Sequence, residues 1–333
     1  MNMKYLYILV SNNSDTYLEQ TYISMYSLHL HMPNAKILLL VDERTDSTFA
    51  NGRENLLKYV DEKIVIELDK GMNNMKRSRY LKTTARQYFS GDYLYIDSDT
   101  IITAPLDEIE KLDCSIGAVR DTHVSIKKHI LKKTIIRLSK EMDYSIEGGD
   151  NFFNSGVLFV KDSAESFSFY KKWHENWVLG TTKNIFIDQI SLAKTDAELG
   201  HTIQEINGVW NCQVTYGVRY LTDAKIVHYL CTNIMADCAD YAYYFQDRRI
   251  FFSLKEHNYL IDNELHSNIE KAKKCFGERL KIVSGEDIDL MSSYLFIMIM
   301  HLYYKHKRIF HNLESVMIKC IKIVRWFDKI IVR

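Results

Sequence analysis

Apolar runs and amphipathic segments alternate along the first part of the chain. Residues 5–10 form an apolar run of the length of a buried strand, and residues 17–31 carry apolar side chains at helical spacing. Strands and helices that alternate in this way predict right-handed βαβ units and a mostly parallel sheet, whose ligands bind at the carboxyl ends of the strands. The further segments of this kind are strands at residues 37–41, 64–66 and 93–96 and helices at residues 49–60 and 79–89.

The alternation loosens after about residue 110. The pattern there predicts strands at residues 154–160 and 225–230, a helix at residues 164–179, and another beginning at residues 188–194. Beyond about residue 240 only mixed helical periodicity remains. We therefore expect a main α/β domain over residues 1–240 and a helical C-terminal region over residues 241–333.

Composition narrows the class of protein. The 333 residues are 47% hydrophobic and carry 43 Lys and Arg against 43 Asp and Glu, which argues against a disordered chain and against nucleic-acid wrapping. The six cysteines form no Cys-x-x-Cys pair, which favours reduced thiols in the cytoplasm over a zinc site or a disulfide framework. Neither the apolar run at residues 5–10 nor that at residues 294–300 predicts a signal peptide or a membrane span.

The last helix predicted from the pattern is amphipathic and basic. Residues 301–333 hold eight Lys or Arg residues against Glu314 and Asp328. Apolar side chains from Leu313 to Ile331 gather on one face, and cations such as Lys322 and Arg325 lie opposite. Such a helix fits an anionic membrane surface, and it fits equally an ordinary helix packed on its own domain.

Asp97 and Asp99 give the strongest local chemical signal. They follow the buried strand at residues 93–96, and carboxylates two residues apart on an extended segment project to the same side. Oxygen ligands select Mg²⁺ or Mn²⁺, which offset the repulsion between the two charges. The plainer alternative is a strand-to-loop junction that uses aspartate as a turn former.

Motifs in a fixed order resemble those of the retaining glycosyltransferases of family 8, which include glycogenin and bacterial lipooligosaccharide galactosyltransferases. The resemblance covers about residues 5–230 and implies the GT-A type, Rossmann-like nucleotide-sugar-binding fold. It rests on the segments Ser78–Leu81, Tyr95–Ile102 with its Asp-x-Asp, Phe153–Phe159, Ile187–Leu192, Val209–Asn211 and Ile226–Tyr229.

This resemblance implies a set of site residues. Asp97, Asp99 and His228 would hold Mn²⁺ or Mg²⁺, and Gln189 and Asp188 would lie at the reacting sugar. The donor would be a UDP-hexose and the acceptor an oligosaccharide or glycolipid in bacterial lipopolysaccharide or capsule biosynthesis, with the enzyme in the cytoplasm or on the inner face of the membrane. The residues expected to bind the donor are Tyr17, Arg79, Ser98, Asn154, Asp188 and Asn211.

Retention of anomeric configuration needs either a covalent intermediate or attack on the face of the leaving group. Gln189 is a poor nucleophile, so we favour same-face attack, in which the departing diphosphate accepts the proton of the acceptor. A catalytic carboxylate such as Asp150 or Glu147 is the alternative.

Two departures from the family pattern leave a second function open. The Lys-Pro-Trp stretch that follows the metal histidine in the family is absent after His228, and of the opening Asp-x-Asn-Tyr loop only Tyr17 is kept. The alternative is therefore an inactive sugar- or partner-binding relative on the same scaffold. A haloacid dehalogenase-type phosphatase is disfavoured because Ile101 stands where that motif wants Thr or Val, and a nucleotidyltransferase because residues 11–16 contain no glycine.

Overall fold

The computed structural model describes residues 3–146, 151–230, 245, 247–273, 290–291 and 293–331, except the side chains of residue 248 and of residues 321–331. The chain separates into two compact units, residues 1–281 and residues 282–333. The first unit extends beyond residue 240, where the sequence analysis set its boundary, because two later helices belong to it.

A seven-stranded, mostly parallel sheet forms the centre of the first unit. The strands are β1 (Lys4–Leu9), β2 (Lys36–Asp42), β3 (Glu62–Ile66), β4 (Tyr93–Ile96), β5 (Thr100–Ile102), β6 (Ile116–Arg120), β7 (Phe153–Val160), β8 (Ile203–Glu205), β9 (Cys212–Gln213) and β10 (Ile226–His228). The large sheet has the order β3-β2-β1-β4-β7-β6-β8, and a small sheet has the order β5-β10-β9. In the large sheet only β7 runs antiparallel to its neighbours β4 and β6, so the predicted fold class is confirmed.

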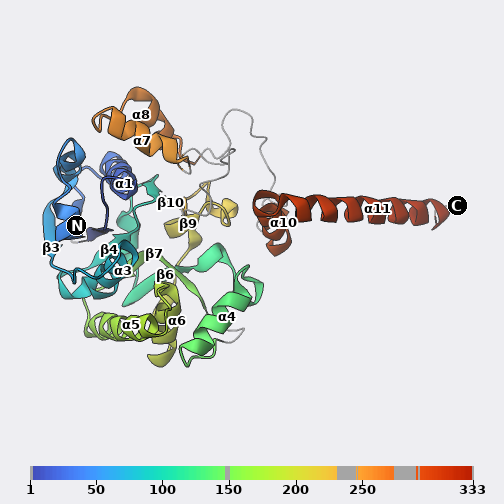
Figure 1. Cartoon of the computed structure of the whole chain (residues 1–333), viewed down its shortest axis with the longest axis horizontal. Coiled ribbons are helices and arrows are strands. Elements are labelled where there is room, and N and C mark those ends of the chain that lie inside the picture. The colour runs from blue at the N-terminus through green and yellow to red at the C-terminus, as the bar shows by residue number, and fades with distance from the viewer. Residues whose placement is uncertain are drawn as a thin grey trace. The chain divides into compact units, whose positions relative to one another are not determined.

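Helices cover both faces of the large sheet (Figure 1). The helices of the first unit are α1 (Tyr17–His31), α2 (Glu43–Asp46), α3 (Asn74–Thr84), α4 (Lys132–Glu141), α5 (Ala164–Thr182), α6 (Asp188–Glu198), α7 (Arg248–Glu256) and α8 (Asn263–Glu270). The single helix predicted at residues 49–60 is wrong, because the chain there forms only a 3₁₀ turn at Arg53–Tyr59. Asn51 and Gly52 precede that turn with positive φ angles of 56° and 93°, which a continuous helix cannot contain.

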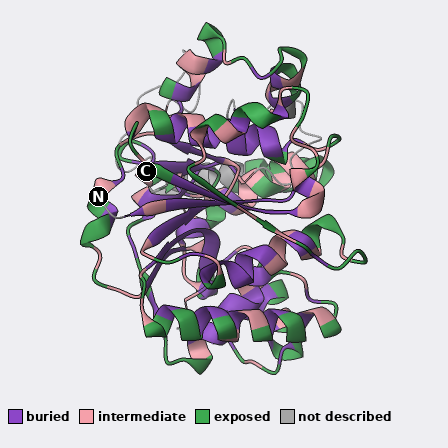
Figure 2. Cartoon of the chain, turned by 90° about the vertical axis from the view of Figure 1, so that its left-hand side faces the viewer, coloured by how far each residue is buried: buried purple, intermediate pink, exposed green. Residues whose placement is uncertain are grey.

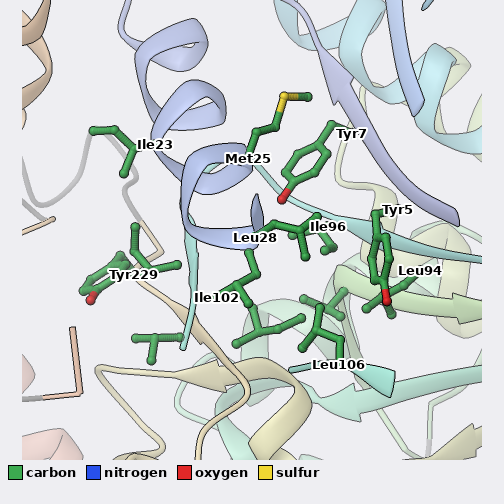
Figure 3. Packing of buried hydrophobic residues seen from close by; sticks show 14 of the residues in the cluster. Tyr5, Tyr7, Ile23, Met25, Leu28, Leu94, Ile96, Ile102, Leu106 and Tyr229 are labelled. Carbon is green, nitrogen blue, oxygen red and sulfur yellow. The ribbon is translucent and has the colours of Figure 1, made fainter. Parts of the chain in front are cut away.

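The strands are apolar without interruption because both faces of the sheet are buried. Along β1, Tyr5, Tyr7 and Leu9 enter one apolar cluster, and Leu6 and Ile8 enter another on the opposite face. Figure 2 shows the buried strands between layers of helices, and Figure 3 shows the packing of the first cluster against α1. Continuous apolar strands of this kind are typical of parallel sheets in α/β proteins.

The second unit contains the helices α10 (Tyr294–Lys305) and α11 (Lys307–Ile331). Leu313, Val316 and Met317 are each about half exposed, so the described part of the predicted apolar face is open. The cations predicted opposite it beyond residue 320 lie outside the described side chains. None of the helices in the described residues has both the length and the apolar composition needed to cross a membrane.

Candidate active site

Three predicted metal ligands lie together at the end of β4. One ligand atom each from Asp97, Asp99 and His228 lies within 4.8 Å of the other two. Nε2 of His228 is 3.1 Å from Oδ1 of Asp99, and the histidine side chain is 3% exposed. Burial alone would lower the pKa of His228, but the carboxylates of Asp99 and Asp97 outweigh that effect and raise it. The cluster therefore favours a positive charge at its centre.

Strand register and α1 fix this cluster. β5 pairs antiparallel with β10, which sets His228 opposite Thr100, the residue after Asp99. The turn between β4 and β5 is tied to α1, since Thr21 donates a hydrogen bond of 2.8 Å to the hydroxyl of Ser98. The hydroxyls of Ser24 and Thr100 lie 2.7 Å apart. The turn is held by buried contacts with α1.

Asn211 determines which nitrogen of His228 carries the proton. Its Oδ1 lies 2.9 Å from Nδ1 of His228, and its Nδ2 donates a hydrogen bond of 2.9 Å to Oδ1 of Asn154. Asn154 in turn donates through Nδ2 to a carboxylate oxygen of Asp121 at 2.8 Å, and a carboxylate oxygen can only accept. This order fixes both amide orientations, so Nδ1–H of His228 donates to Asn211, and Nε2 is the ring nitrogen that faces the carboxylates. A hydrogen bond of this kind is the usual way in which a metal-binding histidine is oriented.

Asp121 stands at the other end of this chain of hydrogen bonds. It also accepts a hydrogen bond of 2.9 Å from Nε2 of His129, whose Nδ1 accepts from the backbone N–H of Leu131. Gln189 lies near enough to help lower the pKa of Asp121, while its own hydrogen bond of 3.3 Å goes to the carbonyl of Phe153. Burial would raise the pKa of Asp121, but the contacts with His129, Asn154 and Gln189 outweigh burial and lower it. Asp121 is therefore an ionised, partly enclosed carboxylate.

A second buried carboxylate, Asp188, is held by two cations. Its Oδ1 lies 2.9 Å from Nε of Arg79, and its Oδ2 lies 3.4 Å from Nζ of Lys82 and accepts a hydrogen bond of 2.8 Å from Ser155. Lys82 also lies 3.4 Å from Oδ1 of Asp97, so it joins this carboxylate to the predicted metal cluster. Burial would raise the pKa of Asp188, but Arg79 and Lys82 hold it well below its ordinary value. Asp188 is therefore an acceptor of hydrogen bonds and not a proton donor.

Gly156 leaves room for the cluster. A Cβ at this position of β7 would lie 2.4 Å from Cε1 of His228, 2.7 Å from Oδ2 of Asp97 and 2.9 Å from Oδ1 of Asn154. The other oxygen of Asp97 accepts from the hydroxyl of Tyr95, so Oδ2 is the oxygen that faces the cluster. Only glycine keeps these groups at their observed positions.

The turn after β6 is strained and is held by Gln213. Thr122 and His123 both have positive φ, 54° and 56°, which is unusual for a β-branched residue. Gln213 accepts a hydrogen bond of 2.7 Å from the N–H of Thr122 and donates one of 2.8 Å to the carbonyl of Arg120. Its own N–H donates to Nε2 of His123 at 3.0 Å. Burial and the charge of Arg219 lower the pKa of His123 to about 3, so its ring stays neutral.

Most of the residues predicted from the sequence meet in this region. Gln189 donates to the carbonyl of Phe153 at 3.3 Å and contacts Asp121, while Ser98 points to α1. Tyr17 begins α1 and is 40% exposed; its hydroxyl contributes to the raised pKa of Arg79, of which Asp188 is the largest cause. Glu147, Asp150 and the segment from Cys231 to Met235 lie outside the described residues.

Three residues of the site, Asp121, Lys82 and Gln213, were not predicted from the sequence. Asp121 directly follows a buried strand, as Asp97 does, so the same signal could have found it. Lys82 lies three residues after the predicted Arg79, on the same face of α3. This spacing could have indicated that Lys82 belongs to the site together with Arg79. No pattern in the sequence pointed to Gln213, whose hydrogen bonds join residues about 90 positions apart.

The mostly parallel α/β unit, with its carboxylate and imidazole cluster at the carboxyl end of β4, has the GT-A type fold of glycosyltransferases. The family described as "Glycosyl transferase family 8" matches residues 8–234, and the chain belongs to this family. Among solved structures, the galactosyltransferase LgtC in complex with donor and acceptor sugar analogues is 15% identical, with a TM-score of 0.54 over 80% of this chain and 100% of that one. An active-site variant of LgtC with glutamine replaced by glutamate is 14% identical, with a TM-score of 0.52 over the same shares. A comparison with curated proteins found no match.

Proposed function

We propose that this glycosyltransferase moves a hexose from a UDP-sugar to a glycan acceptor with retention of anomeric configuration and with the help of a divalent cation. The observation that carries the proposal is the cluster of Asp97, Asp99 and His228, whose ligand atoms lie within 4.8 Å of one another and which Lys82 joins to Asp188. A nucleotide diphosphate needs a bound cation, which the cluster of Asp97, Asp99 and His228 can hold. A sugar with several hydroxyls needs hydrogen-bond acceptors, such as the carboxylate of Asp188.

The donor set fits Mn²⁺ or Mg²⁺. Two carboxylates and one imidazole suit a hard or borderline divalent cation, and Asn211 leaves Nε2 of His228 free to bind it. Gly156 keeps the space between Asp97 and His228 clear. When bound, the cation would stabilise the negative charge that develops on the leaving diphosphate.

The side chains around Asp188 would position the donor sugar. Because Arg79 and Lys82 keep Asp188 ionised, its oxygens can accept hydrogen bonds from hexose hydroxyls at neutral pH. We assign Tyr17, Ser98, Asn154 and Asn211 to donor binding as well. Asn154 and Asn211 would keep their positions in the site through the hydrogen bond between their amides.

Gln189 and Asp121 would face the reacting carbon. The amide of Gln189 is a poor nucleophile. Asp121 has a lowered pKa because of its contacts with His129, Asn154 and Gln189, and a less basic carboxylate is a weaker nucleophile. Neither group is built to form a covalent sugar intermediate. We therefore propose attack by the acceptor hydroxyl on the face of the leaving group, with its proton passing to the departing diphosphate. The negative charge of Asp121 would stabilise the oxocarbenium-like transition state, and Asp188, paired with Arg79 and Lys82, would position the sugar.

The acceptor would be an oligosaccharide or glycolipid of the bacterial lipopolysaccharide or capsule, and the protein would act at the cytoplasmic face of the membrane. The support for this location is the exposure of Leu313, Val316 and Met317 on the apolar face of α11. Three cations precede this face, Lys305 at the end of α10 and Lys307 and Arg308 in the first turn of α11. Removal of residues 301–333 should release the protein from anionic vesicles, and unchanged vesicle binding would remove this part of the proposal.

Nucleotide titration tests the proposal. Thermal unfolding of the protein with UDP, GDP and CDP, each with and without Mn²⁺, should show a higher Tm with UDP plus Mn²⁺ than with either alone. Hydrolysis of UDP-glucose or UDP-galactose should then depend on Mn²⁺ and be lost in Asp99→Asn, which removes one charged ligand. No binding of any nucleotide would favour the inactive relative instead, and full activity of Asp99→Asn would contradict the assignment of the metal site.

A further inference from the structure

The segment between the turn after β6 and the C-terminal half of α4 is strongly basic. Residues 127–140, the basic segment, contain six Lys or Arg residues and no Asp or Glu, although the whole chain has equal numbers of cations and anions. Five of the six side chains are exposed, namely Lys127, Lys128, Lys133, Arg137 and Lys140. The last three follow one another at intervals of four and three residues, so they form a stripe along one side of α4.

This basic segment adjoins the candidate active site. Its only buried polar ring, His129, donates the hydrogen bond of 2.9 Å to Asp121, and its side chain is 1% exposed. Ile135 and Ser139 are buried on the other side of α4, which packs against α6, the helix that begins with Asp188. Figure 1 shows α4 beside α6. The segment thus connects the turn at Asp121 with the helix that carries Asp188 and Gln189.

Among the described acidic residues that follow the segment, only Glu141 pairs with one of its cations. Glu141 lies 2.5 Å from Arg137, and Asp143 lies 2.6 Å from Lys183, a residue outside the segment. Within the described residues, Lys127, Lys128, Lys133 and Lys140 have no ion pair. The first turn of α4 contains Lys132 and Lys133 and no acidic residue, so cations stand at the positive end of the helix dipole. Such an arrangement is unfavourable by itself and is relieved by a bound anion.

We infer that the basic segment binds an anionic group of the acceptor, a phosphate or a carboxylate on the glycan that receives the sugar. This inference rests on the proposed function and gives the acceptor a chemical class. The donor diphosphate is already matched by the metal cluster, so the charge of the basic segment is not needed for it. A membrane surface is the competing partner, but the bond between His129 and Asp121 ties this segment to the reacting centre, which favours the acceptor.

A charge-matched pair of variants tests the inference. The first, Lys127→Gln, Lys128→Gln, Lys133→Gln and Lys140→Gln together, removes four exposed charges of the basic segment. The control, Lys36→Gln, Lys70→Gln, Lys171→Gln and Lys271→Gln together, removes four exposed charges elsewhere in the first unit. Binding of lactose 1-phosphate and of lactose is measured by calorimetry with UDP and Mn²⁺ present, so that the donor's phosphate site is filled.

The wild-type protein and the control should bind lactose 1-phosphate about tenfold or more tightly than lactose, and the first variant should lose this preference, because each exposed pair contributes a few tenths of a kcal/mol. The preference should shrink as salt is raised to about 0.3 M. Equal preference in the first variant and the wild type, or no preference in either, would overturn the inference. Binding to vesicles of phosphatidylglycerol and phosphatidylcholine is measured for the same proteins. If the first variant keeps the phosphate preference and loses only vesicle binding, the inference is also overturned, because the segment is then a membrane contact.

Hydrolysis of UDP-glucose or UDP-galactose without an acceptor separates this inference from the proposed function. The four lysines lie outside the donor site, so the first variant should hydrolyse the donor at the wild-type rate. If the wild-type protein neither binds UDP nor hydrolyses a UDP-hexose, the proposed function fails. If donor hydrolysis is normal in both proteins and the phosphate preference is absent, only the inference about the acceptor fails.

Discussion

Replacing Asn211 with leucine would test how the metal cluster is held. The change keeps a side chain of similar size in a site that is completely buried, and it removes both hydrogen bonds of the amide, to Nδ1 of His228 and to Oδ1 of Asn154. Asn154 keeps its bonds to Asp121 and to the N–H of Gly156. The loss is therefore concentrated on the histidine.

The structure sets the size of the effect. The Nδ1–H of His228 is left buried without an acceptor, and Oδ1 of Asn154 loses one of two donors, so the free energy of unfolding should fall by about 2–4 kcal/mol. The neutral ring then loses the acceptor that favours a proton on Nδ1, so the proton can move to Nε2, the atom that faces Asp99. The affinity for Mn²⁺ should fall by about 10- to 100-fold, as it does when the hydrogen-bonding partner of a metal-binding histidine is removed.

Two measurements check this prediction. Calorimetry gives the Mn²⁺ affinity. ¹⁵N NMR of the metal-free protein, recorded at a pH high enough to leave the ring of His228 neutral, gives its tautomer, which should be Nδ1–H in the wild type and a mixture in Asn211→Leu. Asn176→Leu is the matched control, because Asn176 is a buried asparagine that bonds to Thr195 and Glu198, outside the cluster. It should lose stability and keep Mn²⁺ affinity. Wild-type Mn²⁺ affinity and an unchanged tautomer in Asn211→Leu would refute the role given to Asn211.

Three other changes give measurable outcomes. Gly156→Ala should weaken Mn²⁺ binding at least about tenfold in calorimetry, because the new Cβ would displace His228 or Asp97; wild-type affinity would show that the cluster lies elsewhere. Lys82→Met should lower the free energy of unfolding by about 3 kcal/mol in urea, since one partner of a buried ion pair is removed; a change below about 1 kcal/mol would speak against the pair with Asp188. His123 has a pKa of about 3 in the folded protein and an ordinary value of 6.5 when unfolded, so the unfolded chain binds more protons between these values and stability falls on acidification. Wild type should lose about 2 kcal/mol more than His123→Asn between about pH 7.5 and pH 5.0, and parallel losses would contradict the burial of a neutral ring.

The sequence was most informative where a local pattern reflects burial. The apolar runs located β1, β2, β3, β4 and β7 to within two residues, because a strand covered on both faces must be apolar throughout, but they did not predict β6 or β8. Asp97 and Asp99 could be named because they follow a buried strand, whereas His228 was named only through the resemblance to family 8. The helix predicted at residues 49–60 was wrong because Asn51 and Gly52 adopt positive φ angles. The spacing of apolar side chains does not indicate such a backbone conformation.

The interactions between distant parts of the chain could not be predicted in the same way. Asn154 meets Asp121 because β6 and β7 pair with an irregular register, and Asn211 meets Asn154 from a turn 57 residues later. A hydrogen bond between such residues leaves no periodic trace in the sequence. Each amide alone is an ordinary polar residue, and only the order of donors and acceptors gives the group its role.

The residues after His228 show how a segment without a chemical motif can still serve the site. Glu19 of α1 is completely buried, and its carboxylate accepts hydrogen bonds from Arg53 at 3.2 Å and from the hydroxyl of Tyr259 at 2.7 Å. Lys255 of α7 donates to the carbonyls of Asn13 and Asp15 in the loop that follows β1.

That loop lies at the carboxyl end of β1, the edge of a parallel sheet where ligands bind, and it leads into α1, which holds the turn between Asp97 and Thr100. Removing the hydroxyl of Tyr259, which follows α7, would leave one oxygen of the buried Glu19 carboxylate with Arg53 as its remaining hydrogen-bond donor. The segment around α7 thus contacts both α1 and the loop before it, the two parts that precede and hold the turn between Asp97 and Thr100, although its sequence contains no residue that belongs to the site.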